Sequence, residues 1–272
     1  MGNVIAEIGL NHRGDLQSAK KLIRQASRAG CWGVKFQYRN LRTFYQDKKE
    51  VGDELIFAEV QRNQFNVKQY CELAAYCKEL RIKFGISFFR IQDLLELREA
   101  EQFVDFYKIP SAECLNIPLI EELIGKNRKL FVSIGGHFTK DVIRYLSKYK
   151  NLVTVLHCIA NYPVRLGEQD LNVISYLKKE GFADVGYSSH DSDWEVCLIA
   201  AANGAVWLER HITLDKKGNG LDDTSSSDFL ELKRLVKLFS SYEEICGASI
   251  HLPNQGELIN LQNLGTSLYA KR

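Results

Sequence analysis

The stretch Asp184–Asp222, DVGYSSHDSDWEVCLIAAANGAVWLERHITLDKKGNGLD, has the pattern of a strand, a helix and a second strand. One short apolar run leads to His190 and another leads to His211. The Ala-rich segment Trp194–Asn203 between them is apolar and stops at a glycine, as a buried helix does. The two strands are predicted over Val185–Ser188 and Ala205–Leu208.

The two histidines are predicted to lie on the same edge of a sheet. In a parallel β/α unit, successive strands lie side by side and point the same way, which brings His190 close to His211. Neutral imidazole is the commonest protein metal ligand. Two imidazoles can hold one ion and leave positions open for substrate and water. The alternative is that both are polar residues at strand ends, without a metal.

Length and composition favour one large α/β domain. The chain has 272 residues and a formal charge of +2, and no Lys/Arg block suggests a nucleic-acid surface. No apolar run is long enough for a membrane helix. The apolar run Val4–Leu10 is too short for a signal peptide and is followed at once by polar residues. We therefore expect no nucleic-acid or membrane partner and a cytoplasmic location.

The seven cysteines are scattered through apolar helix and strand patterns, without a Cys-x-x-Cys motif. An odd, dispersed set is more typical of buried free thiols in a reducing compartment than of disulfides or a zinc cluster.

Short apolar runs alternate with amphipathic segments along the whole chain. The remaining predicted strands are Val4–Gly9, Trp32–Gln37, Ile82–Ser87, Val104–Ile109, Lys129–Ser133 and Val153–His157. The remaining predicted helices are Leu16–Ala29, Gln64–Leu80, Gln92–Ala100, Ile117–Ile124, Thr139–Lys148, Leu171–Lys179 and a long helix over Ser227–Ile245. Asp15 is expected to cap the first helix and Gly30 to end it. The polar segment Tyr38–Asn63 is expected to be a loop that acts as a lid or binds substrate.

Eight βα units in this length predict a single-domain α/β fold, a (β/α)8 TIM barrel. An open doubly wound sheet is the structural alternative, but no G-x-G-x-x-G motif follows the first strand. In such barrels the active site lies at the carboxyl ends of the strands. The side chains expected there include Lys35 and Lys108 with several serines, a set that suits a substrate with phosphate and carboxylate groups. Alternatively, each lysine is a solvated charge at the rim.

Six motifs in order along the chain resemble those of the sialic acid synthase family, over about residues 3–270. They are Ile5-Ala-Glu-Ile-Gly-Leu-Asn-His-Arg-Gly14, Val34-Lys-Phe-Gln37, Tyr107-Lys-Ile-Pro-Ser-Ala-Glu113, Leu156-His-Cys158 with Asn161-Tyr-Pro163, Gly186-Tyr-Ser-Ser-His190 and Leu208-Glu-Arg-His-Ile-Thr-Leu-Asp215.

The resemblance implies an enzyme that condenses phosphoenolpyruvate (PEP) with N-acetylmannosamine or a related amino sugar. A divalent ion, Mn²⁺ or Mg²⁺, would be held by His190 and His211 and would polarise the sugar aldehyde. C3 of PEP would attack that carbon, water would add at C2, and phosphate would leave by C–O cleavage.

The resemblance also assigns roles by position. The residues that match PEP contacts are Lys35, Lys108, Ser111, Ser133 and Ser188, with Ser87 where a threonine is usual. The residues that match the sugar side are Glu7, Gln37, Tyr162 and Asp222. Glu113 matches a carboxylate near the reacting carbons and is the candidate for proton transfer or water activation; alternatively it only pairs with Lys108.

Several positions depart from the family pattern. Ser189 stands where an aspartate often precedes the first metal histidine, and Ala160 stands where a Ser or Asn commonly helps to bind PEP. Ser133-Ile-Gly-Gly136 replaces Ser-Thr-Gly-Met, and Leu221 replaces a proline before Asp222.

The resemblance divides the chain into a barrel over residues 1–250 and a tail over residues 251–272. In the family such a tail leads into a small antifreeze-like domain that reaches across a dimer, and we expect that domain to be absent from this polypeptide. The expected partners beyond the substrates are therefore a second copy of the chain, as a homodimer, or a separate C-terminal domain.

Two other functions remain as alternatives. One is another metal-dependent barrel lyase or aldolase that uses the same histidine pair. The other is a barrel with impaired catalysis that serves as a binding or regulatory subunit. The acceptor sugar is open among N-acetylmannosamine, its 6-phosphate and the diacetamido-trideoxy hexoses.

Overall fold

The structure is a computed structural model that describes residues 3–41, 51–248, 250 and 252–264. It separates into two compact units, Met1–Tyr242 and Glu243–Arg272. The expected boundary at residue 250 stays a prediction.

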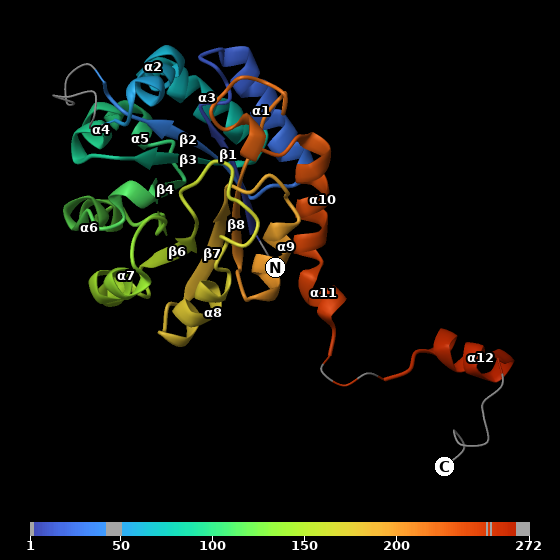
Figure 1. The fold of residues 1–272 in the computed structure, drawn as a ribbon. Coiled ribbons are helices and arrows are strands. Elements are labelled where there is room, and N and C mark those ends of the chain that lie inside the picture. Colours follow the sequence, from blue (N-terminus) through green and yellow to red (C-terminus); the bar gives the residue numbers. More distant parts are fainter. Residues whose placement is uncertain (1–2, 42–50, 249, 251, 265–272) are drawn as a thin grey trace. The chain divides into compact units, whose positions relative to one another are not determined.

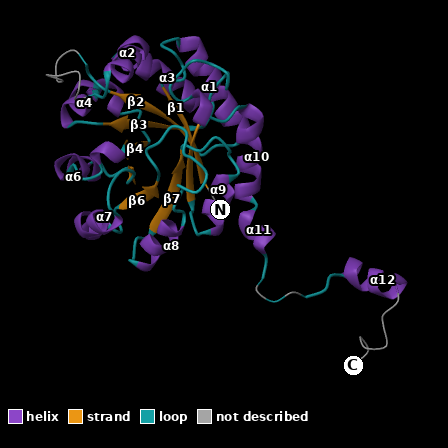
Figure 2. Cartoon of the chain, in the orientation of Figure 1, coloured by secondary structure: helices purple, strands orange, loops and turns teal. Residues whose placement is uncertain are grey.

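The first unit is built on eight parallel strands that close into a barrel in chain order (Figures 1 and 2). The last strand pairs in parallel with the first, with Glu7 opposite His211. The fold predicted from the alternating pattern is thus confirmed. The strands are β1 Asn3–Gly9, β2 Gly33–Tyr38, β3 Lys83–Phe88, β4 Phe106–Ile109, β5 Lys129–Ser133, β6 Val153–His157, β7 Asp184–Ser189 and β8 Trp207–His211.

In the first unit, helices follow the strands and surround the barrel (Figure 2). They are α1 Leu16–Ala29, α2 Glu54–Asn63, α3 Val67–Glu79, α4 Ile91–Glu96, α5 Arg98–Glu101, α6 Ile117–Gly125, α7 Thr139–Leu146, α8 Asn172–Lys179, α9 Val196–Ala202 and α10 Phe229–Ser240. Helix α11 Tyr242–Cys246 begins at the last residue of this unit, and α12 Gln255–Leu264 belongs to the second unit. Short 3₁₀ turns lie at Ser111–Glu113, Ser147–Tyr149 and Asp223–Ser225.

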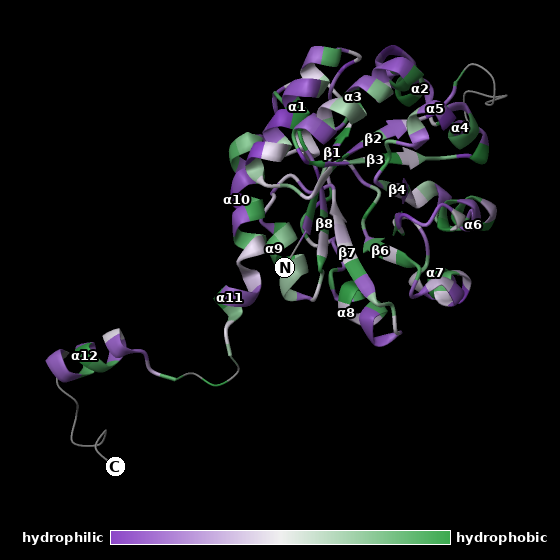
Figure 3. Ribbon diagram, turned by 180° about the vertical axis from the view of Figure 1, so that it is seen from behind, coloured by the Kyte–Doolittle hydropathy of each residue, from purple (hydrophilic) through white to green (hydrophobic). Residues whose placement is uncertain are grey.

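Helix α1 has the predicted ends because its local signals agree with its packing. The Asp15 side chain accepts hydrogen bonds from the backbone N–H groups of Gln17 and Ser18. Gly30 closes the helix in the left-handed region, at φ 88°. Figure 3 shows purple and green residues alternating along the helices around the barrel, as expected for helices that bury one face.

Three expectations about the helices were wrong. The single helix predicted over Gln92–Ala100 is interrupted at Leu97, where α4 ends and α5 begins. The segment Tyr38–Asn63, predicted to be a loop, contains α2, which Asp53 caps by accepting from the N–H of Ile56; residues 42–50 lie outside the described part of the chain. The long helix predicted over Ser227–Ile245 is interrupted at Ser241, where α10 ends and α11 begins.

The amino-terminal part of the barrel interior is filled by an apolar floor. Its members are Ile5, Phe106, Phe131, Leu156 and Trp207. Phe106 and Phe131 meet edge to face, with ring centroids 5.7 Å apart. A Cβ atom added at Gly85 would lie 2.1 Å from Phe106, so the absence of a side chain on β3 makes room for that ring.

Two further observations concern the cysteines and the helices. All seven cysteines are free thiols, and five of them are buried. None of the helices in the described ranges has both the length and the apolar composition needed to span a membrane.

Candidate active site

A pocket of about 340 Å³ opens at the carboxyl ends of the barrel strands. The lining residues are Glu7, Lys35, Gln37, Ser87, Lys108, Pro110, Ser111, Ser133, Tyr162, Ser188, His190, Glu209 and His211. The barrel therefore brings eleven of the thirteen residues singled out from the sequence into one cavity.

Among the residues that line this pocket, two lysines and two glutamates form a buried charged layer across the barrel. Lys35 Nζ lies 2.7 Å from Glu7 Oε2. Lys108 Nζ donates to both carboxylate oxygens of Glu209, at 2.9 and 2.8 Å. Lys35 Nζ also lies 3.9 Å from Glu209 Oε1, so the two pairs are joined. We call Glu7, Lys35, Lys108 and Glu209 the charged layer.

The pKa values of the two carboxylates of the charged layer shift in opposite directions because their charged neighbours differ. Burial would raise the pKa of Glu209, but the nearby Lys108 and Lys35 ammonium groups lower that pKa to about 2. Burial raises the pKa of Glu7; Lys35 opposes this rise and the charge of Glu209 adds to it. Glu209 therefore stays ionised beside Lys108, whereas the nearest carboxylate to Lys35 is that of Glu7.

Serines connect this charged layer to the pocket surface. Lys35 Nζ donates to Ser87 Oγ at 2.7 Å, and Ser188 Oγ donates to Glu209 Oε1 at 3.1 Å. Ser111 and Ser133 line the pocket beside Lys108. Hydroxyls and ammonium groups thus converge from several strands, an arrangement that suits an anionic ligand.

The sequence analysis missed Glu209. It lies two residues before His211 on β8, and alternate residues of a strand face the same side. A glutamate in a strand whose residues are all buried must have a buried cationic partner, and this requirement was the available signal.

His190 and His211 lie next to each other at the pocket wall, with ring centroids 5.5 Å apart. His190 Nδ1 lies 2.6 Å from the carbonyl oxygen of Ile159. This contact fixes the orientation of the ring and does not involve Nε2. Burial lowers the pKa of His190 to about 4. Burial and the neighbouring His190 lower the pKa of His211 well below its usual value, so both rings are neutral at pH 7.

These two histidines fit a divalent cation. His211 Nδ1 is buried and makes no hydrogen bond within the described part of the chain. Neutral imidazole nitrogens suit several divalent ions, among them Mn²⁺. Among the residues that the structure describes, no group of three or more His, Cys, Asp or Glu side chains is arranged around one ion position. Substrate and water would have to supply further ligands.

The Asp222 carboxylate lies beside the histidines, with Oδ2 3.5 Å from His211 Nδ1. A Cβ atom at Gly9 would lie 3.2, 3.4 and 3.5 Å from side-chain atoms of Glu7, Gln37 and Asp222, so these three groups surround Gly9. Gln37 Nε2 donates to Glu7 Oε1 at 2.8 Å. Burial and the charge of Glu7 raise the pKa of Asp222 to about 7.

Tyr162 closes another side of the pocket. Its ring lies 4.1 Å from that of His190, measured between centroids, and the side chain is 49 % exposed. Glu113, in contrast, does not line the pocket; its carboxylate accepts a hydrogen bond from Asn116 Nδ2 at 2.9 Å. The alternative partner considered for Glu113, Lys108, pairs with Glu209 instead.

Of the departures from the family pattern, Ser87 lines the pocket, whereas Ser189, Ala160 and Leu221 do not. Ser189 faces away from the pocket, where it donates to Asp191 Oδ2 at 2.8 Å and accepts from Arg210 at 2.9 Å. Ala160 and Leu221 are exposed.

Comparison with known proteins gives consistent results for sequence and structure. A family model described as the NeuB family matches residues 22–251. The chain is 32 % identical to the N,N'-diacetyllegionaminic acid synthase of Campylobacter jejuni, over 99 % of this chain and 84 % of that protein. It is 33 % identical to the human N-acetylneuraminate-9-phosphate synthase, over 98 % of this chain and 77 % of that protein.

One similar solved structure is an N-acetylneuraminic acid (sialic acid) synthetase from Leptospira borgpetersenii, crystallised with citrate. It superposes with a TM-score of 0.81 at 28 % sequence identity, covering 96 % of this chain and 90 % of that one.

Proposed function

The chain belongs to the NeuB family, and on that premise we propose that it condenses PEP with an N-acetylated amino sugar. The products are a nonulosonic (sialic-type) acid and phosphate. The observation that carries this proposal is the pocket itself, in which two buried lysines, several serines and a neutral histidine pair line one cavity. The enzyme is a transferase that works from a (β/α)8 barrel.

The lysines and serines would bind PEP. Lys35 and Lys108 offer fixed positive charge, while Glu209 prevents them from moving apart before PEP enters. The hydroxyls that complete this side of the pocket are those of Ser87, Ser111, Ser133 and Ser188. The charged layer has no net charge when both lysines and both glutamates are ionised. Binding of the PEP anion therefore adds negative charge beside it.

His190 and His211 would hold the divalent ion, Mn²⁺ or Mg²⁺. When bound, that ion supplies Lewis acidity toward the aldehyde of the open-chain sugar. The protein's part is to present two neutral nitrogens in fixed directions. The Ile159 carbonyl does this for His190 by orienting its ring.

The acceptor sugar would lie on the side of Glu7, Gln37, Asp222 and Tyr162. There C3 of PEP forms the new bond to the aldehyde carbon, a water oxygen adds at C2, and the C–O bond to phosphate breaks. Glu113, just outside the pocket lining, is our candidate for moving a proton to or from that water. Asn116 donates to Oε2 of this carboxylate, so Oε1 is the oxygen that would contact the water.

The partner expectation stays a prediction. A homodimer, or a separate C-terminal domain bound to this chain, would cover the exposed sugar side around Tyr162. Sedimentation of the chain alone, with and without substrates, measures whether it self-associates.

The first experiment is phosphate release from PEP with Mn²⁺ across a panel of amino sugars, with EDTA as control. Metal-dependent release with one sugar would support the proposal and identify the acceptor. Product formation with an aldehyde but without phosphate release would instead favour another metal-dependent aldolase. Binding of PEP and Mn²⁺ without turnover of any sugar would favour a binding or regulatory subunit.

A further inference from the structure

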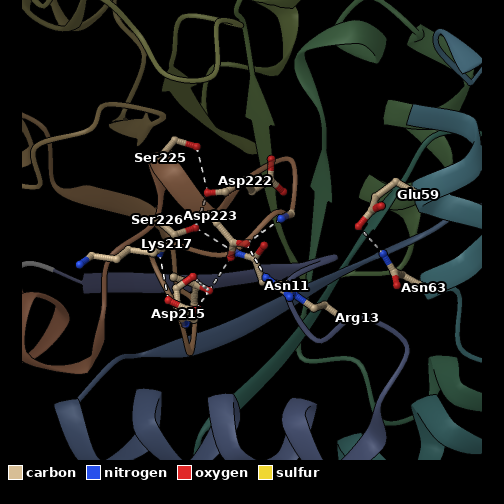
Figure 4. Close-up of polar contacts among 12 residues, drawn as sticks. Asn11, Arg13, Glu59, Asn63, Asp215, Lys217, Asp222, Asp223, Ser225 and Ser226 are labelled. Atoms are coloured by element: carbon tan, nitrogen blue, oxygen red, sulfur yellow. Dashed lines mark hydrogen bonds and ion pairs between the residues drawn. The ribbon is translucent and has the colours of Figure 1, made fainter. Parts of the chain in front are cut away.

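Two loops at the carboxyl ends of β1 and β8 are tied together beside Asp222 (Figure 4). From the loop after β1, Asn11 Nδ2 donates to the Ile212 carbonyl and to Ser226 Oγ, both at 2.9 Å. Asn11 is buried and therefore holds the start and the end of the β8–α10 loop at one point.

An ion pair joins the same two loops at a second point. Arg13 Nη2 lies 2.6 Å from Asp223 Oδ2. The Asp223 side chain is fully buried, whereas that of Arg13 is 48 % exposed. Asp223 Oδ1 also accepts from Thr213 Oγ1 at 2.6 Å, and Oδ2 accepts from the Gly220 N–H at 2.7 Å. One buried carboxylate thus ties three segments of backbone together, and Arg13 supplies the positive charge that it needs.

The surrounding backbone is shaped for this ion pair. Arg13 has φ 53°, in the left-handed region that non-glycine residues seldom adopt. A Cβ atom at Gly218 would lie 2.1 Å from Arg13 Nη2 and 2.4 Å from Asp223 Oδ2. Position 218 therefore has to be glycine for the two charged groups to meet.

The residue next to Asp223 is Asp222, which faces His211. The Asp222 carbonyl oxygen accepts from Ser226 Oγ at 2.6 Å and from Ser225 Oγ at 3.2 Å. Within the described residues, no side chain donates a hydrogen bond to the Asp222 carboxylate; its contact is the one to His211 Nδ1. The direction of this carboxylate is therefore set by how firmly its backbone is held.

We propose that Arg13 and Asp223 are positioning residues for the sugar side of the site. Their ion pair would fix the backbone at Asp222, so that the Asp222 carboxylate stays between His211 and Glu7. The two residues would act on acceptor binding and turnover through Asp222, without touching substrate. The expected effect on sugar kinetics rests on the proposed function, whereas the expected effect on the backbone at Asp222 does not.

The test is Arg13→Ala, with Arg13→Lys as the conservative variant. Because displacing a reacting group by about 1 Å can cost about a hundredfold in rate, we expect kcat/KM for the sugar to fall at least about tenfold in Arg13→Ala. The dissociation constant of PEP should stay within about twofold, because the charged layer is untouched. Arg13→Lys should recover most of the loss, since Arg13 makes a single contact that an ammonium group can replace.

Lys216→Ala is the matched control. Lys216 Nζ pairs with Glu231 at 2.7 Å from the same loop, but this pair does not hold the backbone of Asp222. The variant should keep sugar kinetics close to those of the unmodified enzyme. Wild-type kinetics in Arg13→Ala, equal losses for PEP and sugar, or equal losses in Arg13→Ala and Lys216→Ala would each overturn the proposal.

Hydrogen exchange separates this inference from the proposed function. If the unmodified chain turns over no sugar, the proposed function fails, and amide exchange over residues 212–227 still tests the ion pair. Faster exchange in Arg13→Ala than in Lys216→Ala, above all at the Gly220 N–H, would support the positioning role. Equal exchange in the two variants would overturn it.

Discussion

The apolar floor and the charged layer occupy the same barrel interior, one above the other, yet they follow opposite rules. The floor packs aromatic and aliphatic side chains without polar groups, including Phe106 and Trp207. The charged layer, one inward-facing residue further along the same strands, contains Lys108 and Glu209. Both are buried, so burial alone does not distinguish the structural half of the barrel from the functional half.

The difference shows how a strand can separate stability from chemistry. Along β4 the inward residues are Phe106 and then Lys108, and along β8 they are Trp207, Glu209 and His211. The amino-terminal member of each series fills space, which stabilises the fold. The later members carry charge that costs desolvation energy and is tolerated only because it is paired. Mutations should therefore separate the two regions.

The largest expected effect is on catalysis alone. His190→Ala or His211→Ala removes one of the two proposed metal ligands, and we expect phosphate release to fall by about 10³-fold or more. Circular dichroism and thermal melting should still show a cooperative fold, because neither ring belongs to the floor. Retained turnover in either variant would contradict the metal assignment.

The second prediction concerns a variant that removes one ion pair from the charged layer. Lys108→Met leaves Glu209 buried without its bidentate partner, so the free energy of unfolding should fall by about 3–5 kcal/mol. Guanidinium denaturation measures this loss. Adding Glu209→Gln should recover much of the stability but no activity. If Lys108→Met alone is as stable as the unmodified protein, the pair of Lys108 and Glu209 does not stabilise the fold.

A third variant disturbs the floor and should leave the chemistry intact. Gly85→Ala places a Cβ atom 2.1 Å from Phe106, and we expect a loss of about 1–3 kcal/mol in unfolding free energy from overpacking. Turnover per folded molecule should change little. Gly125→Ala is the matched control, because nothing lies within 4 Å of the added atom. Equal stabilities for the two variants would show that Phe106 moves aside easily.

The smallest expected effect concerns a buried polar group outside the barrel interior. His12 stacks on Phe65 with ring centroids 4.1 Å apart, and its Nδ1 accepts from the Gly14 N–H. Burial lowers the pKa of His12 to about 4, so the folded state holds it neutral while the unfolded state takes up a proton below about pH 6.5. Stability should therefore decrease as the pH falls from 6.5 toward 4, by about 1 kcal/mol down to pH 5.5.

His157, His190 and His211 also have lowered pKa values and contribute to the same slope. The test therefore compares the pH dependence of stability between two proteins. Urea titrations between pH 7 and 5 in EDTA should show a flatter pH dependence for His12→Gln than for the unmodified protein. An unchanged slope would mean that His12 binds its proton equally well in the folded and unfolded states.

The sequence predicts those parts of the fold that depend on local signals. The ends of α1 follow from apolar spacing, the Asp15 cap and Gly30, which are all local. The pocket-lining residues could be listed because they occur at strand ends within recognisable motifs. Helix α2 was missed because the apolar residues of its sequence are consecutive, Leu55-Ile-Phe-Ala58, rather than at helical spacing, and only Val60 and Asn63 are buried.

Contacts between distant segments could not be predicted in the same way. Arg13 and Asp223 are 210 positions apart, and neither residue looks unusual in its local sequence. Glu209 pairs with Lys108 across the barrel interior, at a separation of 101 positions. Such partners become visible when the ring of strands is closed, because closure alone brings their backbones together.

The pairing of β1 with β8 also fixes when the site can form during synthesis. Glu7 emerges from the ribosome early, yet its neighbour His211 is on the last strand of the ring. The hydrogen bond from Asn11 to Ile212 spans 201 positions. Until β8 has been translated, the nascent chain has two unpaired strand edges and no histidine pair. Barrel closure, and with it the meeting of His190 and His211 with Glu7, is therefore a late event in the life of each new molecule.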